Sequence, residues 1–206
     1  MSLELFLNAT SPYARVARIC AQEKGFGDRL TLRWVDPWAD DEALLEANPH
    51  AKVPTLRTPE GVTITETLLI ASYLDNIGTG PDLLPAEALA EVLHGVGLGM
   101  GLIDAAFQQT TARRHADLDD PDRSVLGRRR LAAIERTLTT LEAETAPRHR
   151  YADDAHLTLD DIVIGVGLDY LRLRFQELDW VSHYPALAAW EDARLSRRSF
   201  QYSAFT

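Results

Sequence analysis

A change of pattern near residue 80 constrains the fold of this chain more than any other feature of the sequence. Before it, short apolar stretches with strand-like alternation lie between segments with helical spacing. Residues 79–85 are rich in glycine and proline, which favour a linker, and every later apolar pattern has helical spacing. The sequence therefore predicts a mixed α/β domain over residues 1–78 and an all-α domain over residues 86–206.

The first domain is expected to contain four strands and three helices. Apolar alternation predicts strands over residues 3–7, 30–35, 55–58 and 62–65, and helical spacing predicts helices over residues 15–24, 41–47 and 66–76. The order β-α-β-α-β-β-α is that of a thioredoxin-like fold. In the second domain, helices are expected over residues 86–117, 124–146, 159–174 and 185–194.

Val53-Pro54, directly before the third expected strand, is suited to bind an extended peptide. Proline has no N–H, and it pushes the preceding residue into extended geometry. The N–H and C=O of Val53 are then left to pair with a peptide in the manner of an added strand. Glutathione is a peptide of this kind.

Two further segments stand where helices are expected to begin, and a helix start favours anions. The Thr67 hydroxyl can donate to the γ-glutamyl carboxylate of glutathione, and Glu66 can accept a hydrogen bond from its ammonium group. Ser11 precedes Pro12 at the start of the first helix, where a thiolate is stabilised. Together with Val53-Pro54, these residues predict a glutathione site.

Three stretches carry a resemblance to a known family: residues 10–18 (TSPYARVAR), 48–54 (NPHAKVP) and 65–74 (TETLLIASYL). Over essentially its whole length the chain resembles the glutathione transferases, of the bacterial type with serine at the catalytic position. The resemblance implies a thioredoxin-like domain that binds glutathione and an all-helical domain that supplies the second-substrate pocket. The family more often has glycine in place of Ala51 and serine in place of Thr67.

Ser11 is the candidate catalytic residue. A free thiol has a pKa of about 8.5, so glutathione is mostly protonated at neutral pH. A hydrogen bond donated to the thiolate contributes about 1.5–3 kcal/mol, which lowers the thiol pKa by about one to two units. A helix N-cap role for Ser11 is compatible with this one, and Thr10 is the neighbouring alternative. A dithiol mechanism is disfavoured, since Ala14 stands where a second redox cysteine would be.

Other site residues are expected from the resemblance. Lys52 can pair with the glycine carboxylate of glutathione or be a solvated loop lysine, and His50 is placed near the tripeptide or simply in the loop. Asp104 is positioned to reach the glutathione of a neighbouring subunit. The second-substrate pocket is expected to include Tyr13, Phe107, Arg113 and Tyr170.

Composition excludes several other classes of function. The net charge of −10 argues against nucleic acid as a partner, and no apolar run approaches the ~20 residues of a membrane span. The single cysteine, Cys20, cannot form an internal disulfide, which favours the cytoplasm. The six histidines lack metal-ligand spacing, so no metal is expected. The basic run at residues 128–130 precedes apolar residues at helical spacing, which indicates a solvated helix face.

Two features of the second domain have structural interpretations. Thr158 and Asp161 form a capping-box pattern before an apolar helical segment. Residues 95–101 contain four glycines within an expected helix, each costing about 1 kcal/mol relative to alanine. Close approach of a second helix, room for a bulky substrate, and a broken helix all remain open as explanations.

The sequence therefore predicts a glutathione transferase in which Ser11 stabilises the thiolate for attack on a hydrophobic electrophile. Glutathione is the expected co-substrate, and the resemblance implies a homodimer and a role in detoxification. The alternative is a non-catalytic binding or regulatory protein that keeps the fold.

Overall fold

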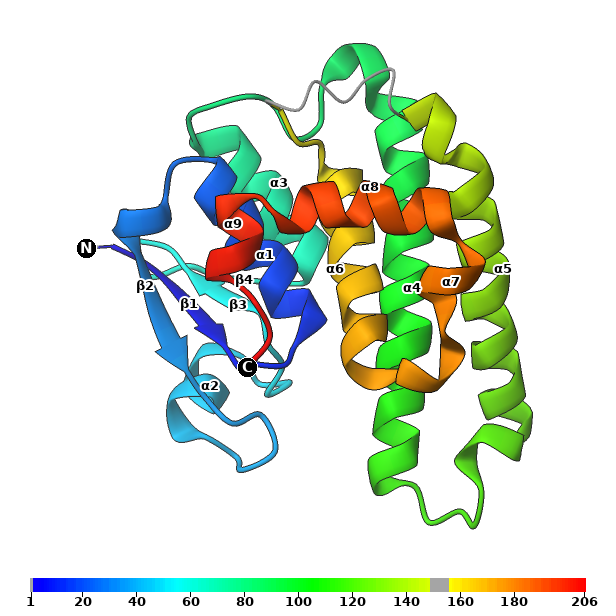
Figure 1. The fold of residues 1–206 in the computed structure, drawn as a ribbon. Coiled ribbons are helices and arrows are strands. Elements are labelled where there is room, and N and C mark those ends of the chain that lie inside the picture. Colours follow the sequence, from blue (N-terminus) through cyan, green and yellow to red (C-terminus); the bar gives the residue numbers. More distant parts are fainter. Residues whose placement is uncertain (1, 149–155) are drawn as a thin grey trace. The chain divides into compact units, whose positions relative to one another are not determined.

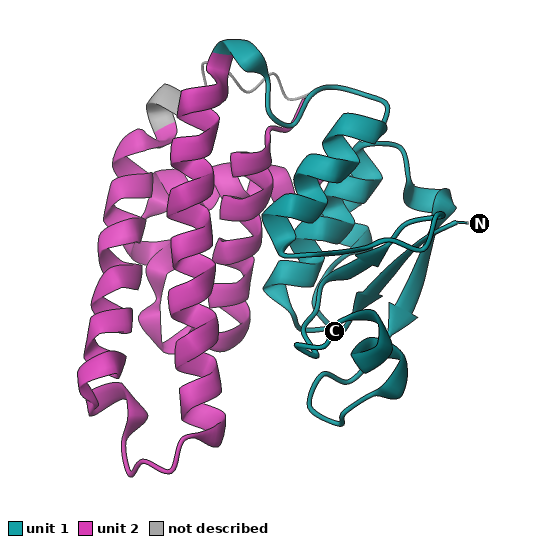
Figure 2. Cartoon of the chain, turned by 180° about the vertical axis from the view of Figure 1, so that it is seen from behind, with its two compact units in different colours: residues 1–87, 198–206 teal, residues 88–197 magenta. Residues whose placement is uncertain are grey.

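The computed structural model describes residues 2–148 and 156–206, and the chain divides into two compact units (Figure 2). The N-terminal unit contains residues 1–87 together with residues 198–206, and the helical unit contains residues 88–197. The expected boundary near residue 80 therefore lies close to the observed one. The last nine residues differ from the expectation, because they pack with the first unit and not with the helices that precede them.

The N-terminal unit is a four-stranded sheet with helices, in the predicted order (Figure 1). The parallel strands β1 and β2 are neighbours, and β1 and β4 each pair antiparallel with β3, so that the order is β2-β1-β3-β4. The elements are β1 (Leu3–Leu7), α1 (Pro12–Glu23), β2 (Leu30–Trp34), α2 (Glu42–Ala47), β3 (Thr55–Arg57), β4 (Thr63–Thr65) and α3 (Thr67–Ile77), with the short α9 (Arg198–Tyr202) added from the end of the chain.

The core of this unit forms where buried apolar residues of β1 meet those of α1. Leu5 of β1 and Val16, Ile19 and Cys20 of α1 have no exposed surface. Because α1 is the crossover between two parallel strands, it returns along the sheet and begins at the carboxyl ends of β1 and β2. The residues that follow β1 are thereby fixed at one edge of the sheet.

The C-terminal segment is fastened to α1 by a buried arginine. The Arg15 guanidinium donates to the Phe200 carbonyl oxygen at 3.4 Å and to Ser203 Oγ at 3.5 Å. It also lies 4.3 Å from the centroid of the Phe205 ring, a cation–π contact. These contacts explain why residues 198–206 belong to the N-terminal unit.

The linker is held against the N-terminal unit by Lys24 at the end of α1. Its ammonium group lies 2.9 Å from an Asp75 carboxylate oxygen and donates to the Pro81 carbonyl oxygen at 2.8 Å. Gly78 is required here, because a Cβ atom at that position would lie 2.8 Å from the Lys24 carbonyl oxygen. The segment predicted as a linker from its glycines and prolines is therefore closely packed along its first part.

The helical unit contains α4 (Leu89–His115), α5 (Val125–Arg148), α6 (Leu159–Arg174), α7 (Trp180–His183) and α8 (Pro185–Leu195). Helix α4 is continuous through the glycine-rich segment, so the broken-helix explanation is wrong. A Cβ atom at Gly99 would lie 2.9 Å from the Ile164 backbone nitrogen of α6. Close approach of a second helix therefore accounts for Gly99, whereas a Cβ atom at Gly97 or Gly101 would meet no atom of another described segment within 4 Å.

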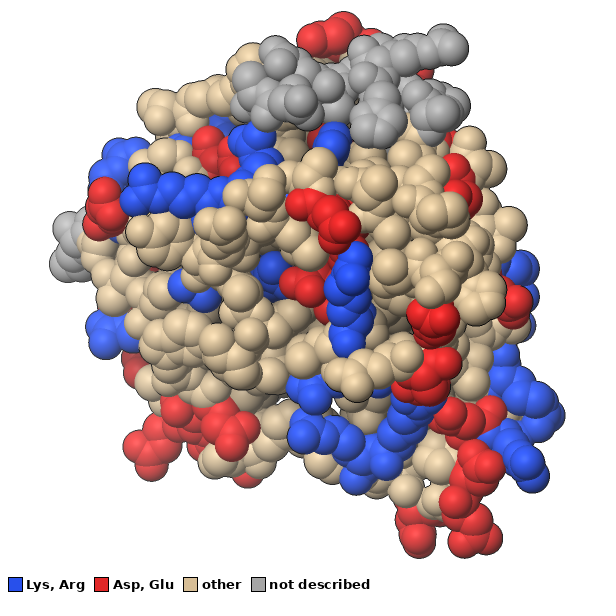
Figure 3. Space-filling view, viewed as in Figure 1, with Lys and Arg blue, Asp and Glu red and all other residues tan. Residues whose placement is uncertain are grey.

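Two helices of this unit bear on the expectations from composition. Residues 86–115, which include α4, are long and apolar enough to cross a membrane by length and composition alone. Core helices of soluble proteins pass the same test, and Leu102 and Ile103 of α4 are fully buried. In α5, Ile134 and Leu138 are buried while Arg128 and Arg129 are exposed, which confirms a solvated helix face for these two arginines. Arg130 differs, because it is half-buried and donates to Gln109 Oε1 at 3.4 Å. Figure 3 shows basic and acidic side chains interspersed on the surface in view.

The predicted capping box begins α6. The Thr158 N–H donates to Asp161 Oδ2 at 3.2 Å, and the Thr158 hydroxyl lies 3.0 Å from the same oxygen. We expect Thr158→Ala to lower the free energy of unfolding by about 1 kcal/mol, because the helix start loses its side-chain cap. Denaturant unfolding of the variant measures this loss, with Thr158→Ser as the control that keeps the hydroxyl. An unchanged unfolding midpoint in Thr158→Ala would contradict the prediction.

A buried carboxylate in α8 predicts a dependence of stability on pH. Glu191 has no exposed surface, and burial raises its pKa to about 7 although Arg172 donates to it at 2.7 Å. Between the ordinary glutamate pKa of about 4.3 and this value, the native state holds a proton that the unfolded state has released. The contribution of Glu191 to stability therefore decreases as pH rises through that window.

We expect the stability of the natural chain, relative to Glu191→Gln, to fall between about pH 4 and about pH 7. Glutamine keeps the size of the side chain but does not titrate, so the difference between the two proteins isolates this one carboxyl group. Urea unfolding of both proteins at several pH values measures it. Parallel stability curves would show that Glu191 does not titrate in this range.

Candidate functional site

Ser11 is the N-cap of α1, as the sequence predicts. Its side-chain oxygen accepts a hydrogen bond from the Ala14 N–H at 3.1 Å, and the residue is 7% exposed. This bond uses an oxygen lone pair, so the hydroxyl proton is still available for donation. Ser11 can therefore act as a helix N-cap and also donate a hydrogen bond to a thiolate.

Val53 presents backbone groups that no other residue of the described chain uses. The Val53-Pro54 peptide bond is cis, and β3 begins at the next residue. In the described part of the chain, no hydrogen bond joins the Val53 N–H or C=O to another residue. Its side chain packs against the buried cluster of Phe6, Leu44 and Ala47. The residue is thus held by its side chain, with its backbone suited to pair with a peptide.

Glu66 and Thr67 form the start of α3. Glu66 is the N-cap residue with φ 68° and ψ 124°, and its side chain is exposed. A positive φ is costly for a residue other than glycine, and such residues are concentrated at functional sites. Thr67 is 5% exposed and occupies the first turn of the helix. The strained Glu66 backbone was not foreseen from the sequence, because glutamate gives no local signal for positive φ.

The strand register brings these three segments to one edge of the sheet. Thr55, the first residue of β3, pairs with Phe6 near the end of β1 and with Thr65 at the end of β4. Val53-Pro54 therefore lies beside the segment from Leu7 to Ser11 on one side and beside Glu66-Thr67 on the other. Ser11, which is more than forty residues from Val53 in the sequence, and Glu66-Thr67 therefore lie at the same edge as Val53-Pro54.

The electrostatics of this edge favour an anion. Helices α1 and α3 both begin here, and the unpaired N–H groups of a helix start carry partial positive charge. Lys52 is exposed beside Val53 and can add a full charge, whereas His50 is exposed one turn earlier in the same loop. The arrangement can hold an extended peptide with terminal carboxylates and place a thiol near Ser11.

Asn48 is a residue of this site whose role the sequence reasoning missed. It is 2% exposed, and its side chain hydrogen bonds within the loop that carries His50, Lys52 and Val53. In the sequence Asn48 is only the first residue of the stretch 48–54 that carries the family resemblance. The side-chain contacts depend on how the loop folds back, so no local pattern could reveal them.

The residues expected at the second-substrate pocket are in different environments. Tyr13 of α1 and Phe107 of α4 are half-buried, and Tyr170 of α6 is 2% exposed within the helical unit. Tyr13 and the other expected pocket residues belong to different units, and the second-substrate pocket remains a prediction.

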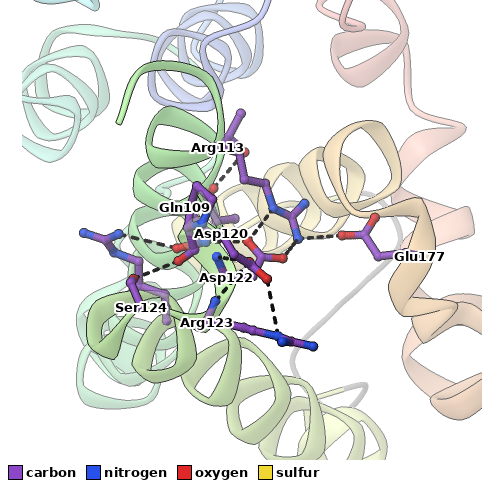
Figure 4. A network of polar contacts seen from close by, with 11 residues as sticks. Gln109, Arg113, Asp120, Asp122, Arg123, Ser124 and Glu177 are labelled. Carbon is purple, nitrogen blue, oxygen red and sulfur yellow. Dashed lines mark hydrogen bonds and ion pairs between the residues drawn. The ribbon is translucent and has the colours of Figure 1, made fainter. Parts of the chain in front are cut away.

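Arg113 belongs to a polar network that joins three parts of the helical unit (Figure 4). Its guanidinium makes two hydrogen bonds to Asp122, at 2.9 and 2.7 Å, and an ion pair with Glu177 at 2.7 Å. Gln109 donates to the same Asp122 carboxylate at 2.6 Å. The bond from Arg113 lowers the pKa of Asp122 below its usual value. These contacts give Arg113 a structural role in addition to the substrate role predicted for it.

No group of histidine, cysteine, aspartate and glutamate suited to hold a metal ion is found among residues 2–148 and 156–206. Cys20 lies in the core of the N-terminal unit, where burial raises the pKa of its thiol. A buried thiol with a raised pKa is a poor nucleophile, and Cys20 therefore acts as a small apolar core residue.

Comparison with known proteins identifies the two parts of the chain. The family model described as glutathione S-transferase, N-terminal domain, matches residues 10–77, and the model for the glutathione S-transferase C-terminal domain matches residues 105–193. An uncharacterized GST-like protein, YibF of Escherichia coli K12, is 27% identical over 202 residues, or 96% of each chain.

Two solved structures resemble the chain over its full length. One is a glutathione transferase family member from Pseudomonas fluorescens Pf-5 with bound glutathione, 30% identical with a TM-score of 0.87 and full coverage of both chains. The other is a glutathione S-transferase from Methylobacillus flagellatus KT with glutathione bound, 31% identical with a TM-score of 0.83 and full coverage of both chains.

Proposed function

Because this chain belongs to the glutathione S-transferase family, we propose that it binds glutathione at the sheet edge formed by Ser11, Val53-Pro54 and Glu66-Thr67. The observation that carries the proposal is the strand register, since it places an unpaired peptide backbone between the starts of two helices. Both structural relatives named above contain glutathione by their descriptions, which supports the same ligand here.

Each part of glutathione has a proposed partner at this edge. The backbone of the cysteinyl residue pairs with the N–H and C=O of Val53, as a short added strand. The γ-glutamyl carboxylate lies at the start of α3 and accepts a hydrogen bond from Thr67, while Glu66 accepts one from the ammonium group. Lys52 pairs with the glycine carboxylate, and His50 lies near it.

Ser11 is the proposed catalytic residue of a transferase. Its hydroxyl donates to the sulfur of bound glutathione and stabilises the thiolate, while the Ala14 N–H holds the Ser11 oxygen in place. The thiolate attacks an electrophilic carbon of a small hydrophobic molecule, the S–C bond forms, and the leaving group departs with its electron pair. Tyr13, Phe107, Arg113 and Tyr170 are the proposed pocket residues for that molecule.

The setting of this activity follows from family membership and composition. We propose a homodimer in the cytoplasm that removes electrophilic compounds. The alternative is a protein that keeps the fold for non-catalytic binding or regulation. Absence of glutathione binding would favour this alternative, and the effect of Ser11→Ala on the bound thiol and on conjugation separates an enzyme from a protein that only binds.

Calorimetric titration with reduced glutathione tests the proposal without choosing an electrophile. We expect saturable binding, and we expect Glu66→Ala to weaken it by about tenfold, which corresponds to the loss of one charged hydrogen bond of about 1.4 kcal/mol. Glu60→Ala is the matched control, because Glu60 is exposed in the turn at the opposite end of β3 and β4. Absence of binding up to several millimolar would overturn the proposal and favour the non-catalytic alternative.

A further inference from the structure

The side chain of Asn48 ties together the loop that precedes the cis-proline. Its Nδ2 donates to the Lys52 carbonyl oxygen at 3.1 Å and to Thr55 Oγ1 at 3.0 Å, and its Oδ1 accepts from the His50 N–H at 3.0 Å. Each polar atom of the buried amide thus has a partner, and all three partners lie between residues 50 and 55. The Asn48 side chain is therefore the hydrogen-bonded centre of this loop.

The same loop is closed by its backbone. The Asn48 N–H donates to the Leu44 carbonyl oxygen at 2.7 Å, and the Asn48 carbonyl oxygen accepts from the Ala51 N–H at 2.9 Å. Ala51 has a φ of 51°, which an alanine adopts only at a cost of about 1–2 kcal/mol. The surrounding contacts must therefore hold this turn in place, and Asn48 supplies most of them.

The Lys52 carbonyl oxygen is the point on which these contacts converge. It accepts from Asn48 Nδ2 and, at 2.8 Å, from the Thr55 hydroxyl. Both donors belong to buried residues, so the carbonyl group is turned toward the interior of the unit. In a planar trans peptide the C=O and the following N–H point in opposite directions. The Val53 N–H is therefore turned away from the interior.

We infer that Asn48 is a positioning residue, which orients the Lys52–Val53 peptide so that the Val53 N–H meets the backbone of glutathione. The inference rests on the proposed function, because it concerns the same site. Asn48 does not touch the ligand in this arrangement and acts through the peptide group that does. Thr55 shares the task through its bond to the same carbonyl oxygen.

The test uses variants of nearly constant size that remove the hydrogen bonds joining Asn48, Thr55 and the Lys52 carbonyl oxygen. Asn48→Asp keeps an acceptor for the His50 N–H but places a second oxygen against the Lys52 carbonyl oxygen. Thr55→Val removes the other donor to that oxygen, and Thr55→Ser restores it. Thr58→Val is the control, because Thr58 is a buried threonine in the turn at the opposite end of β3.

We expect Asn48→Asp and Thr55→Val each to weaken glutathione binding by about tenfold in calorimetry, a factor of the size of one lost hydrogen bond. Thr55→Ser and Thr58→Val should bind as the natural protein does. In steady-state assays with an activated aryl chloride, the KM for glutathione should rise in the first two variants while kcat at saturating glutathione stays unchanged. A purely structural role would lower the folded fraction of the protein without this split.

The possible outcomes separate the inference from the proposed function. If the natural protein does not bind glutathione, the proposed function fails and the inference fails with it. If the natural protein binds and the folded variants Asn48→Asp and Thr55→Val bind equally well, the inference alone is overturned. Should Asn48→Asp not fold, Thr55→Val against Thr55→Ser decides the question by itself.

Discussion

Replacing Ser11 by alanine is expected to slow glutathione conjugation by about 10- to 100-fold near pH 6.5, with little change in glutathione affinity. The hydroxyl bond to the thiolate contributes about 1.5–3 kcal/mol, and its loss raises the pKa of the bound thiol by about one to two units. Below that pKa, each unit reduces the thiolate fraction tenfold. The pH–rate profile of the variant should therefore shift to higher pH.

The measurement of this shift does not depend on the choice of electrophile. Ultraviolet absorbance of the bound thiolate, titrated over pH, gives the thiol pKa in both proteins. Because Ser11 also caps α1, its loss costs about 1 kcal/mol of stability, and Ser124→Ala is the matched control. Ser124 caps α5 by accepting from the Gly127 N–H at 2.9 Å. Equal thiol pKa values in Ser11→Ala and the natural protein would remove Ser11 from the mechanism.

The largest expected loss of stability comes from Lys24→Met. The Lys24 side chain is 2% exposed and its ammonium group contacts the Asp75 carboxylate and the Pro81 carbonyl oxygen. Methionine keeps the length of the side chain but leaves Asp75, which is 13% exposed, without its cation. Breaking a buried ion pair in this way costs about 3–5 kcal/mol. Guanidinium unfolding measures the change in the free energy of unfolding.

Two further variants show whether the loss of stability comes from the unpaired buried charge of Asp75. In Lys24→Met combined with Asp75→Asn, the buried charge is absent, and asparagine can still accept the hydrogen bond that Asp75 receives from the Leu83 N–H at 2.9 Å. We expect the double variant Lys24→Met, Asp75→Asn to recover much of the stability that Lys24→Met loses. Arg33→Met breaks an exposed pair with Glu4 and should cost less than about 1 kcal/mol. A Lys24→Met loss no larger than that of Arg33→Met would refute the prediction.

The boundaries of most elements could be predicted because their patterns are local. The strand over residues 3–7 and the helix over residues 159–174 are confirmed at both ends. Helix α1 begins at Pro12, where the Ser11-Pro12 pair predicts a helix start, whereas helical spacing alone predicts the helix only from residue 15. Helices α7 and α9 were missed, because four or five residues are too short to show a period.

Polar contacts between distant segments could not be predicted. The family resemblance predicts Arg113 as a pocket residue, and nothing in the sequence indicates its bonds to Asp122 and Glu177, which depend on how two loops fold. Lys24 gave no sign in the sequence that it would be buried. Both side chains are long and charged, and such residues are usually exposed unless a specific partner comes to meet them.

The sequence alone determined the order of strands and helices, the division near residue 80 and the three segments that bind glutathione in the proposal. These follow from hydrophobic periodicity and from the restrictions that proline and helix starts place on nearby backbone. Only the tertiary structure decided that Thr55 lies between Phe6 and Thr65, and that Asn48 turns the Lys52 carbonyl group inward. Strand register and the partners of buried polar groups arise from contacts between residues far apart in the chain, which no local pattern records.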